Sequence, residues 1–491
     1  MININWKQFI QRYKNLPVTA KASFWFLFCN IAQKAASMLT IPIITRMLTT
    51  DEYGTYSVFI SYSNILIVLG TLTLYGNGYF VGMKRYNEEK SRYTSSMAGL
   101  MFTITMFLYV IFLLFQKQII FILHQRFFVI TLMFAWVICN GAMNLWFVEN
   151  RYEFKYRLIV ICTLFTAFAT PILKIVFILL FETTGMDKAL GAIIGYVLPI
   201  VIIGIIAWYM MFVKGRTIYV KEYWKFALFF NIPLIPYYLS QTILNQADRF
   251  MIERLDSAGA AGIYSVAYSL AMMVSVINGA VNNTLIPWQF QEMKKGENRK
   301  VAAVVNLVMV IVAAVHLLLI FVAPEAMKIF AAKEYYEAIY VVPPVTIGIL
   351  VMWLTQIFIN IEFFYEKNKW IAISSVLSAI INIILNVVAI PQFGYLAAGY
   401  TTLICYLINM IFHGVVAVIL IKQNGNDKAF DLGKIIFVVV CSIIFMFFTM
   451  LLYEQTAIRW GIIMIVVMIT TFKRREVFKA IRQMWKVVKE K

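Results

Sequence analysis

Five ionisable residues lie within long apolar stretches of this chain, where a charge needs a function or a partner. Four of them, Lys34, Arg46, Lys174 and Arg249, are basic, and Asp248 is the clearest acid at a similar depth. A lysine or arginine at the centre of a membrane helix costs roughly 2.5 to 3.5 kcal/mol on insertion scales, so such residues are functional candidates by default. Their excess of positive charge predicts a cationic lumen that selects anionic ligands, among which phosphate-bearing ligands fit well.

The position of each charge along its stretch separates these candidates. Lys34 and Lys174 lie near the middle of their stretches, from which a side chain does not easily reach water. Arg46 and Arg249 lie nearer an end, so for them a purely structural role is an equal alternative. For Asp248 two interpretations stay open: it titrates or binds a cation that drives transport, or it pairs with one of the two lysines.

Composition identifies the elements that must hold these residues. Hydrophobic residues make up 62% of the 491 residues, charged residues only 14%, and the mean hydropathy is +0.79. Such values exclude an ordinary soluble domain and predict a multi-pass membrane protein. The backbone must then satisfy its hydrogen bonds inside helices, which predicts an all-α fold. We expect 14 spans, near 21–47, 53–80, 94–115, 127–148, 158–181, 188–213, 226–253, 259–287, 301–323, 337–361, 370–390, 396–421, 434–453 and 457–472.

The basic residues are distributed unevenly between the two sides of these spans. Of the 43 Lys and Arg residues, 32 fall on the side of both termini, 7 on the other side and 4 inside spans. The positive-inside rule therefore places both termini in the cytoplasm, and it explains the net charge of +19 without nucleic acid. Residues 1–20 form an apolar face suited to an interfacial helix, and 473–491 form a basic cytoplasmic tail.

No metal or cofactor site is predicted. The five cysteines all fall within spans, without the spacing of a metal site or of an outer disulfide. His316 lies in an apolar run without a polar face, so a packing role and a proton relay are the two alternatives, with packing favoured.

A repeated motif indicates that the chain is built twice. Arg254 stands eight residues before Gly-Ile-Tyr-Ser-Val, which begins at Gly262, and Arg46 stands eight residues before Gly-Thr-Tyr-Ser-Val, which begins at Gly54. Such an internal duplication predicts two six-helix lobes, at 21–213 and 226–421, joined by a cytoplasmic linker at 214–225. Two further helices, at 434–472, have no counterpart in the repeat.

Polar residues recur at helical spacing in both lobes. They either line the space between the lobes or bind neighbouring helices together, which is the more common role of single small polar residues. The large polar candidates are Asn30, Asn64, Tyr238, Gln241, Asn245, Tyr268, Asn278, Asn282, Gln356 and Asn360.

Three segments resemble polysaccharide flippases of the Wzx type, in the superfamily that includes multidrug and toxin exporters and lipid II flippases. They are Ile-Pro-Ile-Ile-Thr-Arg-Met-Leu-Thr-Thr-Asp-Glu-Tyr-Gly-Thr-Tyr-Ser at 41–57, Asp-Arg-Phe-Met-Ile at 248–252 leading into Gly-Ile-Tyr-Ser-Val-Ala-Tyr at 262–268, and Ile-Pro-Gln-Phe-Gly-Tyr-Leu-Ala-Ala-Gly at 390–399. The resemblance covers nearly the whole length. Span 1 departs from the lipid II flippases because it lacks their dense arginine cluster.

This resemblance implies a non-enzymatic function in the bacterial cytoplasmic membrane. The implied activity moves an undecaprenyl-diphosphate-linked oligosaccharide, as for O-antigen or capsule, to the outer leaflet by alternating access of the two lobes, with membrane lipid and polysaccharide polymerase machinery as further partners. Lys34, Arg46, Lys174 and Arg249 would meet the diphosphate or acidic sugars, and the polar candidates would bind glycan. Asp248 is the candidate for a coupling proton or cation on the first of its two interpretations above.

Four alternatives fit less well. A cation-coupled drug exporter shares the architecture but should carry more acid and less base in its lobes, and a lipid II-type flippase is the other transport alternative. A polymerase or ligase would need larger outer loops with an acid–base pair, since those at 116–126 and 324–336 have about a dozen residues each. A passive scaffold or channel does not require lysines at mid-span.

Overall fold

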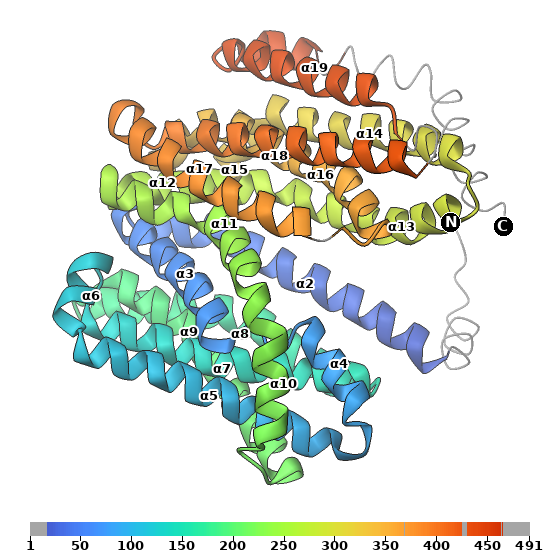
Figure 1. Ribbon diagram of the computed structural model, residues 1–491. Coiled ribbons are helices and arrows are strands. Elements are labelled where there is room, and N and C mark those ends of the chain that lie inside the picture. Colours follow the sequence, from blue (N-terminus) through green and yellow to red (C-terminus); the bar gives the residue numbers. More distant parts are fainter. Residues whose placement is uncertain (1–16, 368, 425–429, 463, 465–491) are drawn as a thin grey trace, which may run out of the picture. The chain divides into compact units, whose positions relative to one another are not determined.

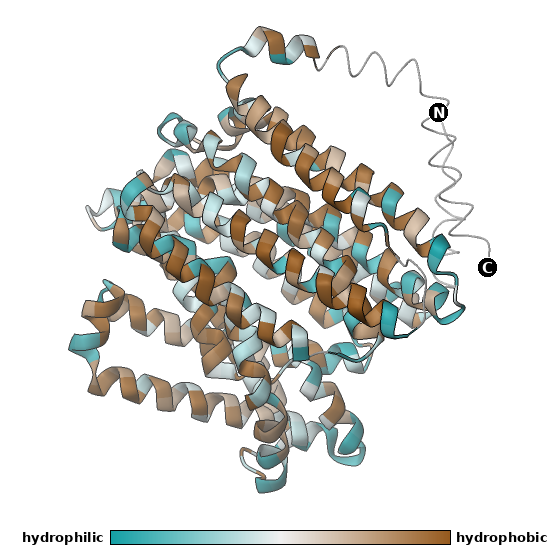
Figure 2. Ribbon diagram, turned by 45° about the horizontal axis from the view of Figure 1, so that its top comes forward, coloured by the Kyte–Doolittle hydropathy of each residue, from teal (hydrophilic) through white to brown (hydrophobic). Residues whose placement is uncertain are grey.

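The computed structural model describes residues 17–367, 369–424, 430–462 and 464, and those residues form helices with no strand. Thirteen helical segments within them are long and apolar enough to cross a membrane, and they match the first thirteen predicted spans. The all-α membrane fold is therefore confirmed. Residues 1–16, most of the fourteenth predicted span and the basic tail lie outside the described residues. Apolar residues dominate the long helices, and hydrophilic residues gather at their ends and connections (Figure 2).

The chain divides into two compact units, Met1–Phe250 and Met251–Lys491. This division falls inside the helix Ile235–Leu255. The predicted linker at 214–225 lies earlier, where the helix Lys188–Gly215 is followed by the helix Lys221–Asn231. The described helices of the first unit are α2 (Val18–Met47), α3 (Thr50–Thr71), α4 (Asn77–Arg85), η1 (Asn87–Glu89), α5 (Lys90–Leu114), α6 (Gln116–Leu123), α7 (Phe127–Tyr152), α8 (Tyr156–Thr183), α9 (Lys188–Gly215), α10 (Lys221–Asn231), η2 (Ile232–Leu234) and α11 (Ile235–Leu255) as far as Phe250 (Figure 1).

The second unit contains the remaining helices. They are α12 (Ala258–Ala271), η3 (Met272–Val274), α13 (Ser275–Lys294), α14 (Asn298–Phe321), α15 (Ala323–Phe330), η4 (Lys333–Tyr340), α16 (Val342–Phe364), α17 (Lys369–Phe393), α18 (Leu396–Gln423) and α19 (Leu432–Leu451). Helix α16 is the most buried span of this unit and packs against α12, α14, α18 and α19. In the first unit the apolar core lies where α5, α7 and α9 meet, around Met97, Ala142 and Ala207.

The repeated motif has the same local structure in both units. It lies in the first turns of α3 and of α12, and Tyr56 and Tyr264 are both buried. Each helix is also capped by a hydroxyl at the 208-residue spacing of the motif: Glu52 N donates to Thr49 Oγ1 (3.3 Å), and Ala260 N donates to Ser257 Oγ (3.1 Å). A hydroxyl at this position satisfies a backbone N–H that the first helical turn leaves free. The shared cap extends the internal repeat beyond the motif itself.

Among the span boundaries that differ from those predicted, two have a clear local reason. The second span ends at Thr71 rather than 80, because Leu72 and Thr73 adopt left-handed backbone angles (φ 45° and 50°) that break the helix. The tenth begins at Val342 rather than 337, because Pro343 and Pro344 occupy its first turn, where proline is tolerated, and 3-10 helix precedes them.

The prolines within the predicted spans do not act alike. Proline removes a backbone donor and is expected to interrupt a helix. This expectation is wrong for Pro42, Pro171 and Pro287, which lie inside continuous helices. It holds at Pro233, because the short 3-10 segment η2 separates α10 from α11 there.

Candidate functional site

A polar pocket in the first unit lies between the second half of α3, the turn that follows it, and α11. Its volume is about 460 Å³. It is lined by Asn64, Ile67, Val68, Thr73, Tyr75, Gly76, Tyr238, Gln241, Thr242, Asn245 and Gln246. Four of these, Asn64, Tyr238, Gln241 and Asn245, are predicted glycan-lining residues, so two helices far apart in sequence bring their polar faces to one cavity.

The turn after α3 supplies the side of the pocket that sequence periodicity did not reveal. Thr73 lies in the left-handed backbone region there, which is unusual for a β-branched residue and is often found at functional sites. Its hydroxyl is buried and has no hydrogen-bond partner within the described structure. A buried hydroxyl without a hydrogen-bond partner destabilises the folded protein. A ligand hydroxyl in the pocket would supply the missing hydrogen bond. The only sequence feature that indicates this turn is the glycine-rich run from Gly70 to Gly78.

Arg249 lies one helical turn beyond the pocket on α11. Its guanidinium donates to the carbonyl oxygen of Asn245 and to Oε1 of Gln246, both at 3.0 Å. The same Oε1 accepts a hydrogen bond from Ser61 Oγ on α3 at 3.3 Å. A stacked ring pair, Tyr62 with Phe250 at 5.2 Å between centroids, joins the same two helices. The arginine is thus held at one end of the polar pocket.

Lys174 is buried within the first unit on α8. Its side chain is 7% exposed, its Nζ donates to the Tyr56 hydroxyl at 3.2 Å, and it also lies 5.4 Å from the centre of that ring. No carboxylate of the described residues lies within the 4.0 Å of an ion pair. The ammonium is therefore buried with a tyrosine rather than neutralised by an acid, which is energetically costly.

Close helix packing produces this burial. At Gly195 of α9 an added Cβ would lie 2.5 Å from the backbone of Lys174, so only glycine permits the two helices to approach at this point. The next residue, Tyr196, packs its ring against Tyr56 and Trp136. Gly195 and Tyr196 together therefore build the aromatic surroundings of Lys174.

Two tyrosines of α3 connect the buried lysine with the arginine. Tyr56 contacts Lys174, its ring lies 6.0 Å from that of Tyr53, and Tyr53 interacts electrostatically with Arg249. The first unit thus carries two basic groups along one face of α3, at separate points.

The three predicted residues on α2 are placed differently. Lys34, Arg46 and Asn30 are all exposed within the structure. Arg46 bonds only to its own helix, through the carbonyl oxygen of Pro42, while Lys34 has no ion pair within the described residues. Lys34 is therefore not enclosed by its own unit, in contrast with Lys174.

Asp248 is buried on α11, at 1% exposure. Neither Lys34 nor Lys174 has a carboxylate within 4.0 Å in the described part of the chain, so the predicted alternative that Asp248 pairs with one of them is not formed in this conformation. No group of three or more His, Cys, Asp or Glu residues in the described structure is arranged to hold a metal.

The predicted polar residues of the second unit contact other polar or aromatic side chains of that unit. Gln356 Nε2 donates to Asn360 Oδ1 (3.0 Å), and Asn360 Nδ2 donates to Gln289 Oε1 (3.2 Å). Asn278 lies 3.4 Å from His316 Nε2, and Tyr268 packs its ring against Tyr264. Asn282, also on α13, is half-buried. These contacts are those of polar residues between packed helices.

The histidines of the second unit are both enclosed. The other ring nitrogen of His316, Nδ1, lies 2.8 Å from the carbonyl oxygen of Val312 on the same helix. This contact is typical of a histidine that packs between helices. Sequence reasoning missed the other, His413 of α18, which contacts Glu362 of α16 at 2.5 Å with both side chains almost fully buried. Glu362 lies at the end of the predicted span 337–361, and nothing in the sequence linked it to a histidine 51 residues away.

The chain is thus a repeated, all-helical membrane protein whose first unit holds a polar pocket with Arg249 close to one end. The sequence matches the family described as "Polysaccharide biosynthesis protein" over residues 19–293, more than half of its length. The chain belongs to this family.

Two Haemophilus influenzae proteins are similar in sequence. One, named "Lsg locus putative protein 1", is 28% identical over 204 residues, which cover 38% of this chain and 49% of that protein. The other, an "Uncharacterized membrane protein", is 24% identical over 381 residues, which cover 74% of this chain and 88% of that protein. The chain thus spans about half the length of the first relative and most of the second.

Two solved structures share the fold. A lipid II flippase, MurJ, in an inward closed conformation, matches with a TM-score of 0.65 and 15% identity over 93% of this chain and all of that chain. An inward-facing multidrug resistance transporter of the MATE family, in the MOP superfamily, matches with a TM-score of 0.61 and 12% identity over 81% of this chain and 96% of that chain. At this identity the likeness establishes the fold.

Proposed function

We propose that this protein is a flippase that moves an undecaprenyl-diphosphate-linked oligosaccharide from the cytoplasmic to the outer leaflet of the bacterial cytoplasmic membrane. The family to which the chain belongs supports a role in polysaccharide biosynthesis, and the shared fold supports transport. The observation that carries the proposal is the polar pocket of the first unit, with Arg249 at its end and an unpartnered hydroxyl in its wall.

The lining of this pocket suits a glycan. Sugar hydroxyls donate and accept hydrogen bonds, and the pocket offers amides at Gln241 and Asn245, a phenol at Tyr238 and the Thr73 hydroxyl. Side chains of both kinds, donor and acceptor, line one cavity that is large enough for a small ligand. A transporter for apolar drugs would not require so many polar groups.

The basic residues suit the diphosphate. Arg249 presents a planar guanidinium, which binds phosphate oxygens in pairs, and the buried Lys174 adds a positive charge that no acid of the described structure cancels. Lys34 and Arg46, exposed on α2, would meet the same group as the two units tilt between inward-open and outward-open states. The glycan would thus be recognised by hydrogen bonds, and the diphosphate by charge.

The test is flipping of a defined lipid-linked glycan in proteoliposomes, together with surface glycan in cells that depend on this protein. Lys34→Ala and Lys174→Ala should abolish flipping at normal protein levels. Thr73→Val should slow it about three- to tenfold, because one hydrogen bond contributes roughly 0.5 to 1.5 kcal/mol. Thr184→Val is the matched control, since that exposed hydroxyl bonds only to its own helix. Wild-type flipping by both lysine variants would refute the electrostatic basis of the proposal.

A cation-coupled drug exporter is the second candidate, because the MATE transporters share the fold and Asp248 is a buried acid. Efflux of cationic dyes from the same proteoliposomes separates the two. We expect no dye efflux, and flipping that responds to an imposed proton or sodium gradient in the wild type but not in Asp248→Asn. If flipping never depends on a gradient, Asp248 has no coupling role.

A further inference from the structure

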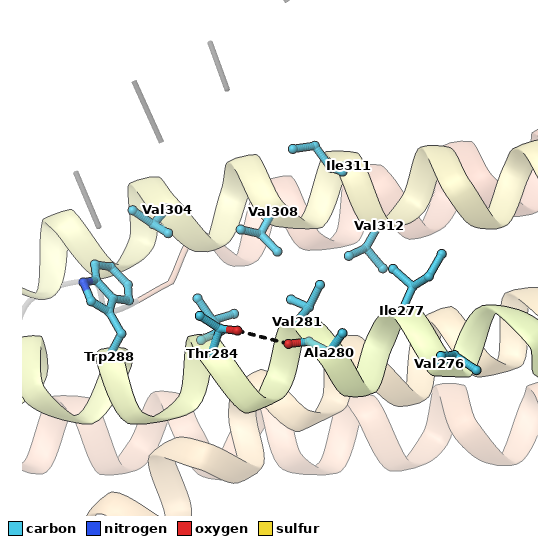
Figure 3. A pocket seen from close by; sticks show the side chains of 11 residues that line it. Val276, Ile277, Ala280, Val281, Thr284, Trp288, Val304, Val308, Ile311 and Val312 are labelled. Carbon is cyan, nitrogen blue, oxygen red and sulfur yellow. Dashed lines mark hydrogen bonds between the residues drawn. The ribbon is translucent and has the colours of Figure 1, made fainter. Parts of the chain in front are cut away.

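A second cavity lies in the second unit, between α13 and α14. Figure 3 shows side chains from both helices pointing toward each other across it. Its volume is about 550 Å³, and it is lined by Val276, Ile277, Ala280, Val281, Thr284, Leu285, Trp288, Val304, Val308, Ile311 and Val312. We call it the α13–α14 groove.

The groove is almost entirely apolar. Its one hydroxyl, Thr284 Oγ1, already donates to the Ala280 carbonyl of its own helix at 3.1 Å (Figure 3). Ala280 leaves the middle of the groove hollow, while valines at 304, 308 and 312 form one continuous face of α14. Both helices belong to membrane spans, so the occupant at this depth is a hydrocarbon chain.

The length of the groove matches one leaflet. From Val276 to Trp288 is twelve residues, or roughly 18 Å of helix, and half of a hydrocarbon core is roughly 15 Å. Trp288 closes one end, and tryptophan is the residue typical of the membrane interface. One acyl chain of one leaflet fits these limits, whereas a long polyisoprenoid tail would extend beyond them.

A basic cluster follows the tryptophan end. Glu292 and Lys295 lie one and two helical turns beyond Trp288 on the same face of α13, and Lys300 lies one turn before Val304 on α14. The buried carboxylate of Glu292 forms ion pairs with Lys295 Nζ at 2.7 Å and with Lys300 Nζ at 3.1 Å. These three side chains together therefore carry one positive charge. Lys294 and Arg299, both exposed, add two more in the same connection, and the exposed Glu297 removes one.

We propose that the α13–α14 groove binds one acyl chain of an anionic phospholipid, whose phosphate lies against Lys295 and Lys300. An apolar groove alone gives no preference for a site in a bilayer, because lipid tails are as apolar as the side chains that line it. Selectivity must come from the headgroup, and basic clusters between membrane helices bind anionic headgroups. The site is separate from the polar pocket and does not depend on the proposed substrate.

The test is native mass spectrometry of the full-length protein titrated with phosphatidylglycerol or with phosphatidylcholine of the same chains. We expect preferential retention of one phosphatidylglycerol. Lys295→Gln should weaken it about fivefold, from roughly 1 kcal/mol per basic residue at an anionic surface. Glu292→Gln should strengthen it, because both lysines lose their competing carboxylate. The control is Lys434→Gln, which removes an exposed lysine that is likewise paired with a carboxylate, Asp431.

A groove-filling variant tests the position of the chain. Thr284→Phe should reduce retention of either lipid, and Cys441→Phe, at an exposed position of α19, should not. Equal retention of the two lipids, or insensitivity to Glu292→Gln and Lys295→Gln, would overturn the proposal. So would displacement of phosphatidylglycerol by a polyprenyl phosphate at equal concentration, which would assign the groove to the carrier lipid, or crosslinking of two copies through Thr284→Cys, which would assign it to a second chain.

Discussion

At the scale of single residues, Lys174 shows how a charge is kept inside a membrane protein without an acid. Its ammonium has a tyrosine hydroxyl and a tyrosine ring, but no carboxylate within 4.0 Å in the described structure. If the residue at this position had only a structural role, an apolar side chain would make the fold more stable than a lysine does. Burying the Lys174 ammonium costs stability, and this cost is the physical reason to assign the residue a function.

This argument predicts that stability and transport respond to Lys174→Met in opposite directions. Methionine is similar in length and removes the buried charge, so the melting temperature in detergent should rise by several degrees while flipping is lost. Lys34→Met is the matched control, because Lys34 is exposed and its replacement should leave the melting temperature within about a degree. A fall in the melting temperature of Lys174→Met would mean that the lysine is mainly structural.

A second residue pair, on the second unit, predicts a dependence on pH. Arg459 is buried and holds Glu325 through two hydrogen bonds, at 2.6 Å and 2.8 Å. Burial raises the pKa of the Glu325 carboxyl, but the hydrogen bonds and charge of Arg459 outweigh it, and the pKa lies below its ordinary value. A carboxylate with a lowered pKa stabilises the fold above its unfolded pKa, and this stability is lost as the pH falls through the folded pKa.

We therefore expect the wild-type protein to lose stability on acidification below the ordinary pKa of a glutamate, and Glu325→Gln to lose less. Melting temperatures in detergent between neutral and acidic pH measure this difference. Glu334→Gln is the control, because that carboxyl of the neighbouring 3-10 helix η4 has no ion pair within the described residues. Parallel curves for the wild type and Glu325→Gln would show that the pair adds no pH-dependent stability.

At the scale of elements, glycines set how closely helices pack. Gly195 lies against the backbone of Lys174, whereas Gly279 of α13 has no atom within 4 Å of the position of an added Cβ. Both are helical positions, at which alanine is favoured over glycine by roughly 1 kcal/mol when nothing else intervenes. The two glycines therefore form a matched pair.

We predict opposite effects of alanine at these two positions. Gly195→Ala should force α8 and α9 apart and lower stability by about 1 to 3 kcal/mol, as overpacking does. It should also reduce flipping, since it moves the backbone that carries Lys174. Gly279→Ala should leave stability equal or higher. Thermal unfolding of the two variants measures the contrast, and a stable Gly195→Ala protein would show that these helices can separate at little cost.

At the scale of the whole molecule, the distribution of charge predicts its orientation in the membrane. The 32 basic residues on the side of both termini, against 7 on the other, predict that the termini lie in the cytoplasm. Single cysteines in a variant without the five native cysteines test this with an impermeant thiol reagent on intact cells. Lys117→Cys and Gly185→Cys should react, and Lys90→Cys and Lys225→Cys should react only after lysis. The reverse pattern would invert the topology.

Hydropathy was enough to predict the membrane class and the all-α fold, because long apolar stretches are the signature of membrane helices, whose backbone hydrogen bonds are satisfied within each helix. A matched motif, 208 residues apart, indicated the internal repeat. Helical periodicity indicated the polar faces. The same reasoning placed Asn64, Tyr238, Gln241 and Asn245 on polar faces. It did not show that these faces share one pocket, because that depends on which helices pack together. Packing also buries Lys174 while leaving Lys34 exposed, although both lie near mid-span. The Thr73 hydroxyl and the His413–Glu362 contact required coordinates for the same reason: their chemistry comes from a backbone turn and from a neighbour distant in sequence, and neither leaves a periodic signal in the chain.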